Sequence, residues 1–299
     1  MAADVALLTD SRYEAETAPN GDWYLANILS DDGLLRAALS DLGVTTVRLD
    51  WRRSDVDWSD YRSALFRTTW DYFDRFDEFS AWLARVRTQT RLCNDAELVE
   101  WNMDKHYLAD LESRGVPVVP TRFVERGTTD GLRSLLEGEG WHEAVVKPCV
   151  SGAARHTYRL SSANVDEVNA TVAPLLASES FMLQPFQPAI VSHGEDSLMV
   201  FGGRYSHAVR KTAKAGDFRV QDDHGGVARA CEPTAAQIEL AEQAMSACQP
   251  RPVYGRVDMI RDGRGGWMVM ELELIEPELW LRFHPPAATA FARAFAATL

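Results

Sequence analysis

The segment V-Y-G-R-V-D-M-I (253–260) is followed by R-D-G-R-G-G (261–266) and then by W-M-V-M-E-L-E-L-I (267–275). The first and third segments alternate apolar with charged residues, as strands with one buried face do. The middle segment is rich in Gly and Asp, which favour tight turns. Together the three segments predict an antiparallel β-hairpin.

The two faces of this hairpin differ in chemistry, because successive side chains of a strand point to opposite sides. Arg256 and Asp258 share one face of the first strand, and Glu271 and Glu273 share one face of the second. The opposite, apolar faces form the predicted core, with Val257 and Met259 in the first strand and Met268, Met270, Leu272 and Leu274 in the second.

A symmetric register about the turn places Asp258 opposite Glu271 and Arg256 opposite Glu273. Like charges directly opposite each other destabilise a sheet, so this acidic cluster requires a cation. Carboxylate oxygens suit Mg²⁺, with Mn²⁺ as an alternative ion. We predict a Mg²⁺ site at Asp258, Glu271 and Glu273; the alternative is an edge hairpin whose acids face solvent.

The composition indicates a globular protein whose ligand is a small molecule. The 299 residues are 46% hydrophobic and 25% charged, which suffices for two or three subdomains. The net charge of −13 and the lack of a basic run argue against nucleic acid or an anionic membrane as the partner. The N-terminus has no basic segment before its first apolar stretch, so we expect a cytoplasmic protein. The oligomeric state is left open.

The first third of the chain alternates strands and helices, which predicts a parallel sheet wrapped by helices. The predicted strands are 4–10, 44–49 and 63–69, and the predicted helices are 23–42 and 78–86. Ligands of such sheets meet the carboxyl ends of the strands, which here are Thr9–Arg12 and Thr68–Tyr72. The alternative is that these are ordinary polar loops.

The remainder predicts a second and a third unit, giving a mixed α/β chain of three domains: 1–93, 94–186 and 187–299. The expected elements of the middle unit are a helical passage at 94–115, strands at 114–121, 143–160 (with a turn) and 180–186, and helices at 130–137 and 165–176. The third unit contains the acidic hairpin.

Lys147 closes an apolar strand and is followed by the small-residue turn P-C-V-S-G-A-A-R (148–155). Such a turn lets backbone N–H groups approach phosphate oxygens, although the sequence is not a Walker loop. The alternative is a solvated lysine beside an ordinary turn. The four cysteines are scattered without zinc spacing, and Cys149 is the one expected to lie nearest a site, because Lys147 is two residues away.

The order of these features resembles the ATP-grasp ligases from about Asn94 to the C-terminus, and the N-terminal α/β unit fits the domain that commonly precedes the grasp. The features are Lys105, Lys147, Q-P-F (184–186), G-E-D (194–196), R-V-D (256–258) and E-L-E (271–273). Locally, G-D-F-R (216–219) followed by G-G (225–226) is similar to the branch with glutathione synthetases and ribosomal-protein glutamate ligases.

The resemblance implies an ATP site with Mg²⁺. The implied nucleotide-binding residues are Lys105 and Lys147 for phosphates, Ser151 and Gly152 in the turn, Gln184 and Phe186 for adenine, Glu195 for ribose, and Lys211. The implied catalytic residues are Arg256, Lys147 and Arg219. The sequence departs from the family pattern at two places. The family's E-x-N is E-L-E here, followed by I-E-P-E-L (275–279). The segment D-S-L (196–198) stands where the close branch often has an arginine.

Over its whole length, including T-T-W-D-Y (68–72), the sequence is similar to ring-closing cyclo-ligases of this superfamily. That similarity implies a small amino-acid-like carboxylate substrate, which ATP phosphorylates and whose own nitrogen then closes a ring. Arg210–Gly226 is the expected lid, or else a solvated loop. The alternatives are a ligase that joins its substrate to a separate amine and a non-enzymatic nucleotide-binding module.

Overall fold

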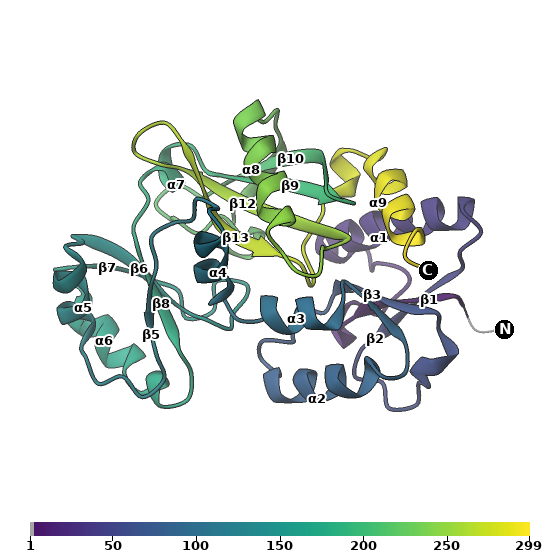
Figure 1. Ribbon diagram of the computed structural model, residues 1–299, viewed down its shortest axis with the longest axis horizontal. Helices are drawn as coiled ribbons and strands as arrows, with labels where there is room; N and C mark the ends of the chain where they lie inside the picture. Colours follow the sequence, from purple (N-terminus) through teal and green to yellow (C-terminus); the bar gives the residue numbers. More distant parts are fainter. Residues whose placement is uncertain (1–2) are drawn as a thin grey trace.

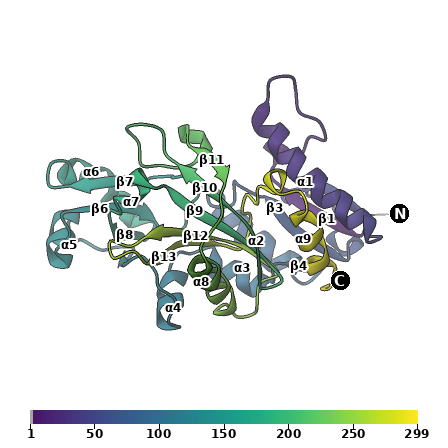
Figure 2. The same ribbon diagram turned by 90° about the horizontal axis from the view of Figure 1, so that it is seen from above.

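The computed structural model describes residues 3–299, without the side chain of Asp223. Three β-sheets follow one another through the molecule (Figure 1). The N-terminal sheet lies at one end, the central sheet at the other, and the C-terminal sheet between them (Figures 1 and 2). Within the described residues, no helix combines the length and the apolar character that a membrane crossing requires.

The N-terminal sheet is parallel, as predicted, with the strand order β2-β1-β3-β4. Its strands are β1 (Val5–Thr9), β2 (Thr46–Asp50), β3 (Ser63–Thr68) and β4 (Arg91–Cys93), and its helices are α1 (Trp23–Asp41) and α2 (Phe76–Val86). Strands β1 and β3 are buried along their whole length, which explains the apolar runs Val5–Leu8 and Ala64–Phe66.

The central region begins with α3 (Ala96–Asn102) and α4 (Tyr107–Ser113) and contains an antiparallel sheet of order β5-β8-β6-β7. Its strands are β5 (Arg122–Val124), β6 (Glu143–Pro148), β7 (Tyr158–Ser161) and β8 (Phe181–Pro185), covered by α5 (Leu132–Glu139) and α6 (Val165–Val172). The predicted strand at 114–121 is wrong: the segment contains two prolines, and its Val118 makes only an isolated bridge with Val269.

The C-terminal region is built on an antiparallel sheet of order β11-β10-β9-β12-β13. Its elements are α7 (Ala189–Ser192), β9 (Glu195–Phe201), β10 (Arg204–Thr212), β11 (Val227–Ala230), α8 (Ala235–Ser246), β12 (Tyr254–Arg261), β13 (Trp267–Glu273) and α9 (Ala287–Ala296). The first three residues of the expected lid, Arg210–Thr212, therefore belong to β10.

The hairpin β12–β13 has the predicted register at its acidic end, where Arg256 pairs with Glu273 and Asp258 with Glu271. A β-bulge follows, so that Met259 pairs with Val269 and Met270 is the extra residue. The prediction that Met268 and Met270 share the core face with Leu272 is therefore wrong. Val269 enters that core instead, and the two methionines pack on the opposite side.

The N-terminal and C-terminal sheets share a hydrophobic core. Leu7 of β1 and Leu35 of α1 belong to the same buried cluster as Phe201 of β9 and Phe291 of α9. Helices α1 and α9 lie side by side at this junction (Figures 1 and 2). The Asn94 side-chain amide donates hydrogen bonds to the Leu274 and Tyr254 carbonyl oxygens at 2.7 and 2.8 Å. The central sheet packs with α5 and α6 on a core of its own, while Met182 of β8 belongs to the buried cluster of the C-terminal sheet.

Candidate active site

A cavity of about 190 Å³ lies where the central sheet faces the acidic end of the β12–β13 hairpin. All the site residues predicted from the sequence line it, although they come from six strands and four loops. They are Lys105, Lys147, Ser151, Gly152, Gln184, Phe186, Glu195, Lys211, Arg219, Arg256, Asp258, Glu271 and Glu273. The structure thus brings the whole predicted set to one place, while the role of each residue is a matter for experiment.

The three carboxylates of the hairpin meet at one point of this cavity. Oxygen atoms of Asp258, Glu271 and Glu273 all lie within 4.8 Å of one another. Arg256 donates two hydrogen bonds to Asp258, at 2.9 and 2.8 Å, and also contacts Glu273. The Lys147 ammonium lies 2.5 Å from Glu271 Oε1. Protein cations thus offset the mutual repulsion of the three acids.

The electrostatics of the cluster keep two of its acids ionised. Burial opposes the ionisation of Asp258, but the charges of Arg256 and Lys211 outweigh it and lower its pKa. Burial likewise disfavours the Glu271 carboxylate, yet Lys147 and Lys105 bring its pKa down to about 2. Clustered, ionised carboxylate oxygens that face a cavity fit Mg²⁺, which binds hard oxygen donors.

The two lysines that we predict to bind phosphate lie in different segments of the central region. Lys105 donates a hydrogen bond from Nζ to the Ser151 carbonyl oxygen at 2.6 Å, and its backbone N–H donates to the Cys149 carbonyl at 2.9 Å. Lys147 stands near the end of β6. Both ammonium groups therefore flank the turn that follows β6, as a phosphate-binding site requires.

That turn adopts a backbone that places small residues against the N-terminal region. Ala153 and Ala154 have φ angles of +48° and +57°. A Cβ atom on Gly152 would lie 2.5 Å from Cε1 of Phe73, so only glycine fits beside this ring. Phe73 follows β3, and the small-residue sequence therefore allows the N-terminal region to close over the turn.

The opposite end of the cavity is largely apolar. Arg159 covers the Phe186 ring at 3.7 Å from its centroid, and Phe218 meets Phe186 edge-on at 6.1 Å. Gln184 Nε2 donates to Thr121 Oγ1 at 2.9 Å. Met270 joins this wall because of the β-bulge, and alternation alone could not reveal it. A flat aromatic base fits such a lining.

Glu195 and Lys211 also line the cavity. Lys211 forms ion pairs with Glu195 and, at 3.0 Å, with Asp258. Burial raises the pKa of Glu195 to about 7 despite the neighbouring lysine. Arg219 is held by Asp217, with 2.7 Å between Nη2 and Oδ2, at the edge of the loop that precedes β11.

Of the strand-end residues in the N-terminal sheet that we expected near a ligand, Tyr72 lines the cavity. Arg12 instead forms a bidentate ion pair with Asp10, at 3.0 and 2.7 Å, and the Trp51 indole donates to Asp71. These charges satisfy one another within the N-terminal region. Conversely, the cavity includes Glu276, whose only sequence signal was the departure I-E-P-E-L from the family pattern.

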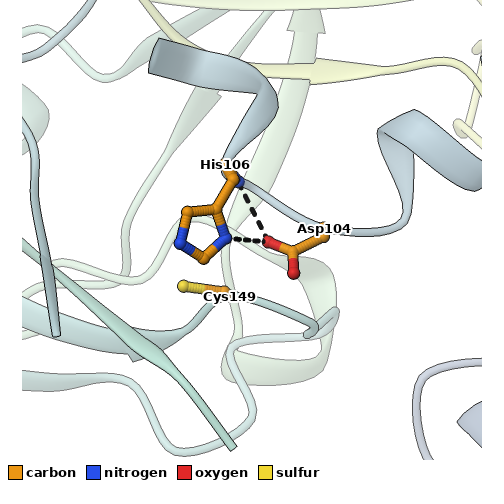
Figure 3. A group of neighbouring side chains, drawn as sticks. All are labelled: Asp104, His106 and Cys149. Atoms are coloured by element: carbon orange, nitrogen blue, oxygen red, sulfur yellow. Dashed lines mark hydrogen bonds and ion pairs between the residues drawn. The ribbon is translucent and has the colours of Figure 1, made fainter. Parts of the chain in front are cut away.

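A second group of metal-binding residue types lies behind Lys105. Figure 3 shows the His106 ring turned toward Asp104, with the Cys149 sulfur nearby. His106 Nδ1 lies 2.5 Å from Asp104 and Nε2 lies 3.1 Å from Glu125, so both ring nitrogens are occupied. Burial raises the Cys149 pKa, which keeps the thiol protonated. This cluster orients the Lys105 segment. We expected Cys149 to lie near the site, but its side chain lies in the hydrophobic core and not in the cavity wall.

Replacing Lys147 with alanine should weaken ATP binding and slow phosphoryl transfer together, because its ammonium group faces both the β6 turn and Glu271. We expect a loss of about tenfold or more in ATP affinity, as for a charge-assisted contact of about 1.5–3 kcal/mol. Calorimetric titration with a non-hydrolysable ATP analogue measures the first effect, and ADP formation measures the second. Unchanged nucleotide affinity would assign the lysine another task.

The fold is that of the ATP-grasp ligases, as the sequence predicted. A RimK domain ATP-grasp protein from Sphaerobacter thermophilus has a TM-score of 0.66 at 18% identity, covering 98% of this chain and 99% of that one. A D-alanine–D-alanine ligase from Bacillus anthracis has a TM-score of 0.65 at 14% identity, with coverages of 99% and 95%. At such identities the likeness establishes the fold.

More similar proteins define the family. Residues 5–94 match the family described as the N-terminal domain of D-cycloserine synthetase DcsG. The cycloserine biosynthesis protein DcsG of Streptomyces lavendulae is 36% identical over 280 residues, which are 89% of this chain and 92% of that protein. A crystal structure of D-cycloserine synthetase DcsG has a TM-score of 0.87 at 34% identity, with coverages of 98% and 99%. The chain belongs to the DcsG family of ATP-dependent ligases.

Proposed function

We propose that the chain uses ATP to phosphorylate the carboxylate of O-ureido-D-serine and then closes the ring of D-cycloserine. Two relatives named for cycloserine biosynthesis and D-cycloserine synthesis support this substrate. The observation that carries the proposal is the convergence of Arg256, the three hairpin carboxylates and three lysines on one cavity. Phosphoryl transfer needs such positioning and charge neutralisation, and no nucleophilic side chain.

The reaction has three steps. A carboxylate oxygen of the substrate attacks the γ-phosphorus of ATP, and ADP leaves with the electron pair of the broken P–O bond. The substrate nitrogen that is bonded to oxygen then attacks the acyl carbon, forming the C–N bond of a five-membered ring while phosphate leaves and the nitrogen loses its proton. Water finally removes the carbamoyl group as CO₂ and ammonia.

The residues divide this work by position. Arg256 faces the cavity beside the carboxylates and is assigned to the reacting carboxylate and the γ-phosphoryl group. Lys105 and Lys147 bind phosphate oxygens. Asp258, Glu271 and Glu273 would hold Mg²⁺, with Mn²⁺ as an alternative, and a bound ion neutralises phosphate charge. We assign Gln184 and Phe186 to adenine, and Glu195 and Lys211 to the nucleotide's ribose and phosphates.

Water must be excluded while the acyl phosphate exists. Residues 218–221, which include Arg219, line the cavity from the loop between β10 and β11. Phe218 and Val220 belong to the same hydrophobic cluster as Phe186 and Met270. We assign this loop the role of a lid that orders over the nucleotide, with Arg219 near the γ-phosphate.

Isotope labelling tests ring closure directly. With ATP, O-ureido-D-serine and ¹⁵N-labelled D-alanine, we expect unlabelled D-cycloserine and ADP formation that does not depend on the added amine. A tethered nucleophile reaches an effective molarity on the order of 10⁵ M or more, so no second acceptor is needed. Label in the product, or ADP formation only with D-alanine, would instead identify a ligase that makes an intermolecular amide.

A further inference from the structure

Glu276 occupies the cavity wall just beyond the acidic hairpin. It follows Glu273 by three residues and lines the same cavity as Arg256. Its backbone carbonyl accepts a hydrogen bond of 2.8 Å from the indole Nε1 of Trp70. Trp70 follows β3, so the N-terminal region fixes the position of this acid.

The charge of Glu276 distinguishes it from its neighbours. Asp258, Glu271, Glu273 and Glu195 each pair with Arg256, Lys147 or Lys211. Across residues 3–299, no lysine, arginine or histidine whose side chain is described forms an ion pair with Glu276. Burial, and then the Glu273 charge, raise its pKa to about 8. Lys105 and Arg256, which also line the cavity, lower this pKa but form no ion pair with Glu276, so the acid is left to pair with a cationic ligand.

Tyr72 stands on the same side of the cavity. Its ring is fixed by Phe73 and Phe79, with centroids 5.6 and 5.2 Å away. Tyr72 and Glu276 both line the cavity, and burial together with the Glu276 charge raises the pKa of Tyr72. The Tyr72 hydroxyl makes no hydrogen bond within the described part of the chain, so it is available to a ligand.

We propose that Glu276, with Tyr72 beside it, binds the α-ammonium group of the amino-acid substrate. The inference rests on the proposed function, in which Arg256 takes the carboxylate of that substrate. The ammonium and carboxylate groups are bonded to the same carbon, so their partners must stand close together on the cavity wall. Arg256 and Glu276 meet this condition, because both line the same cavity and the Arg256 charge lowers the pKa of Glu276.

This subsite would also select configuration. The substrate is then fixed at three points. Its ammonium and carboxylate groups, which are bonded to the same carbon, each make a charged contact. Its side chain must also reach back to the carboxyl carbon. An enantiomer with the ammonium group on the other side would leave Glu276 without its partner. Glu276 is therefore a specificity-determining residue, distinct from the three carboxylates assigned to the metal.

The test is a comparison of two substrates in two proteins. The substrates are O-ureido-D-serine and 3-(ureidooxy)propionate, which lacks only the ammonium group. The wild-type protein should prefer the amino acid by about 100-fold or more in kcat/KM, as expected for a buried charged contact. In Glu276→Gln, this preference should fall to about fivefold or less, because the ammonium group has lost its partner. The KM for ATP and the Mg²⁺ dependence should stay as in the wild type.

Glu239→Gln serves as the matched control, because this exposed residue of α8 lies outside the cavity. It should retain the full preference for the amino acid. If Glu276→Gln lowers kcat/KM equally for both substrates, or shifts the Mg²⁺ dependence, the ammonium assignment is overturned. If the wild-type protein forms no ADP from either compound, the proposed function itself fails, which is a different result.

Discussion

Arg256→Ala is expected to reduce ADP formation from ATP and O-ureido-D-serine by about 10³-fold or more, in the range of other arginines that stabilise phosphoryl transfer. Arg256 is buried, its side chain lies 5.2 Å from the Trp280 ring centroid, and it faces the cavity next to the carboxylate cluster. Its guanidinium is therefore pre-positioned for negative charge that develops during transfer. Single-turnover measurement of ADP gives the effect on chemistry.

The same substitution removes a partner of Asp258 and Glu273, so its effect on folding must be measured separately. Breaking a buried ion pair costs about 3–5 kcal/mol of stability. Arg256→Lys is the useful companion, because it keeps the positive charge but loses the bidentate contact. We expect Arg256→Lys to fold and to retain ATP binding while ADP formation falls severely. A folded Arg256→Ala protein with ADP formation near that of the wild type would contradict the assignment.

Glu271→Gln is expected to slow turnover by about 10²-fold at limiting Mg²⁺, with partial recovery as Mg²⁺ is raised. The amide keeps an oxygen but loses the charge that suits a divalent ion, and the effect is of the size seen for altered metal sites. The change also leaves Lys147 without its anionic partner. ADP formation measured across a Mg²⁺ titration reports both the midpoint and the maximal rate.

Glu273→Asn provides the comparison for Glu271→Gln. Asparagine is the residue of the family's E-x-N pattern at this position, so we expect a smaller loss than with Glu271→Gln. Because burial raises the pKa of Glu273, its charge is the more costly of the two to maintain. Unchanged turnover of Glu271→Gln at limiting Mg²⁺ would place the metal elsewhere.

The sequence was most informative where two strands flank a short turn. A symmetric register about that turn predicted that Arg256 pairs with Glu273, and this pairing is confirmed. A β-bulge leaves no trace in the alternation of apolar residues, because Val269 and Met270 are both apolar. The assignment of Met270 to the core rather than the cavity was therefore wrong for a physical reason.

Long-range pairing explains the other differences. Asp10 and Arg12 follow a buried strand, as ligand-binding residues do, but they pair with each other. Glu276 could not be recognised from the sequence, because its proposed role depends on its place in the cavity and on its having no ion-pair partner among residues 3–299. The convergence of the nucleotide residues was predicted through the family resemblance, since their spacing alone left ordinary loops as an alternative.

The core shared by the N-terminal and C-terminal sheets has a mechanical consequence. Those two sheets form one jaw, because separating them would expose Leu7, Phe201 and Phe291 to water. We therefore expect opening of the cleft to fall to the central sheet, which carries the Lys147 ammonium and packs largely on a core of its own, although Met182 of β8 belongs to the core of the C-terminal sheet. The contact between Lys147 and Glu271 links the two jaws. Under the proposed roles, an entering nucleotide and its Mg²⁺ must therefore compete with this ion pair.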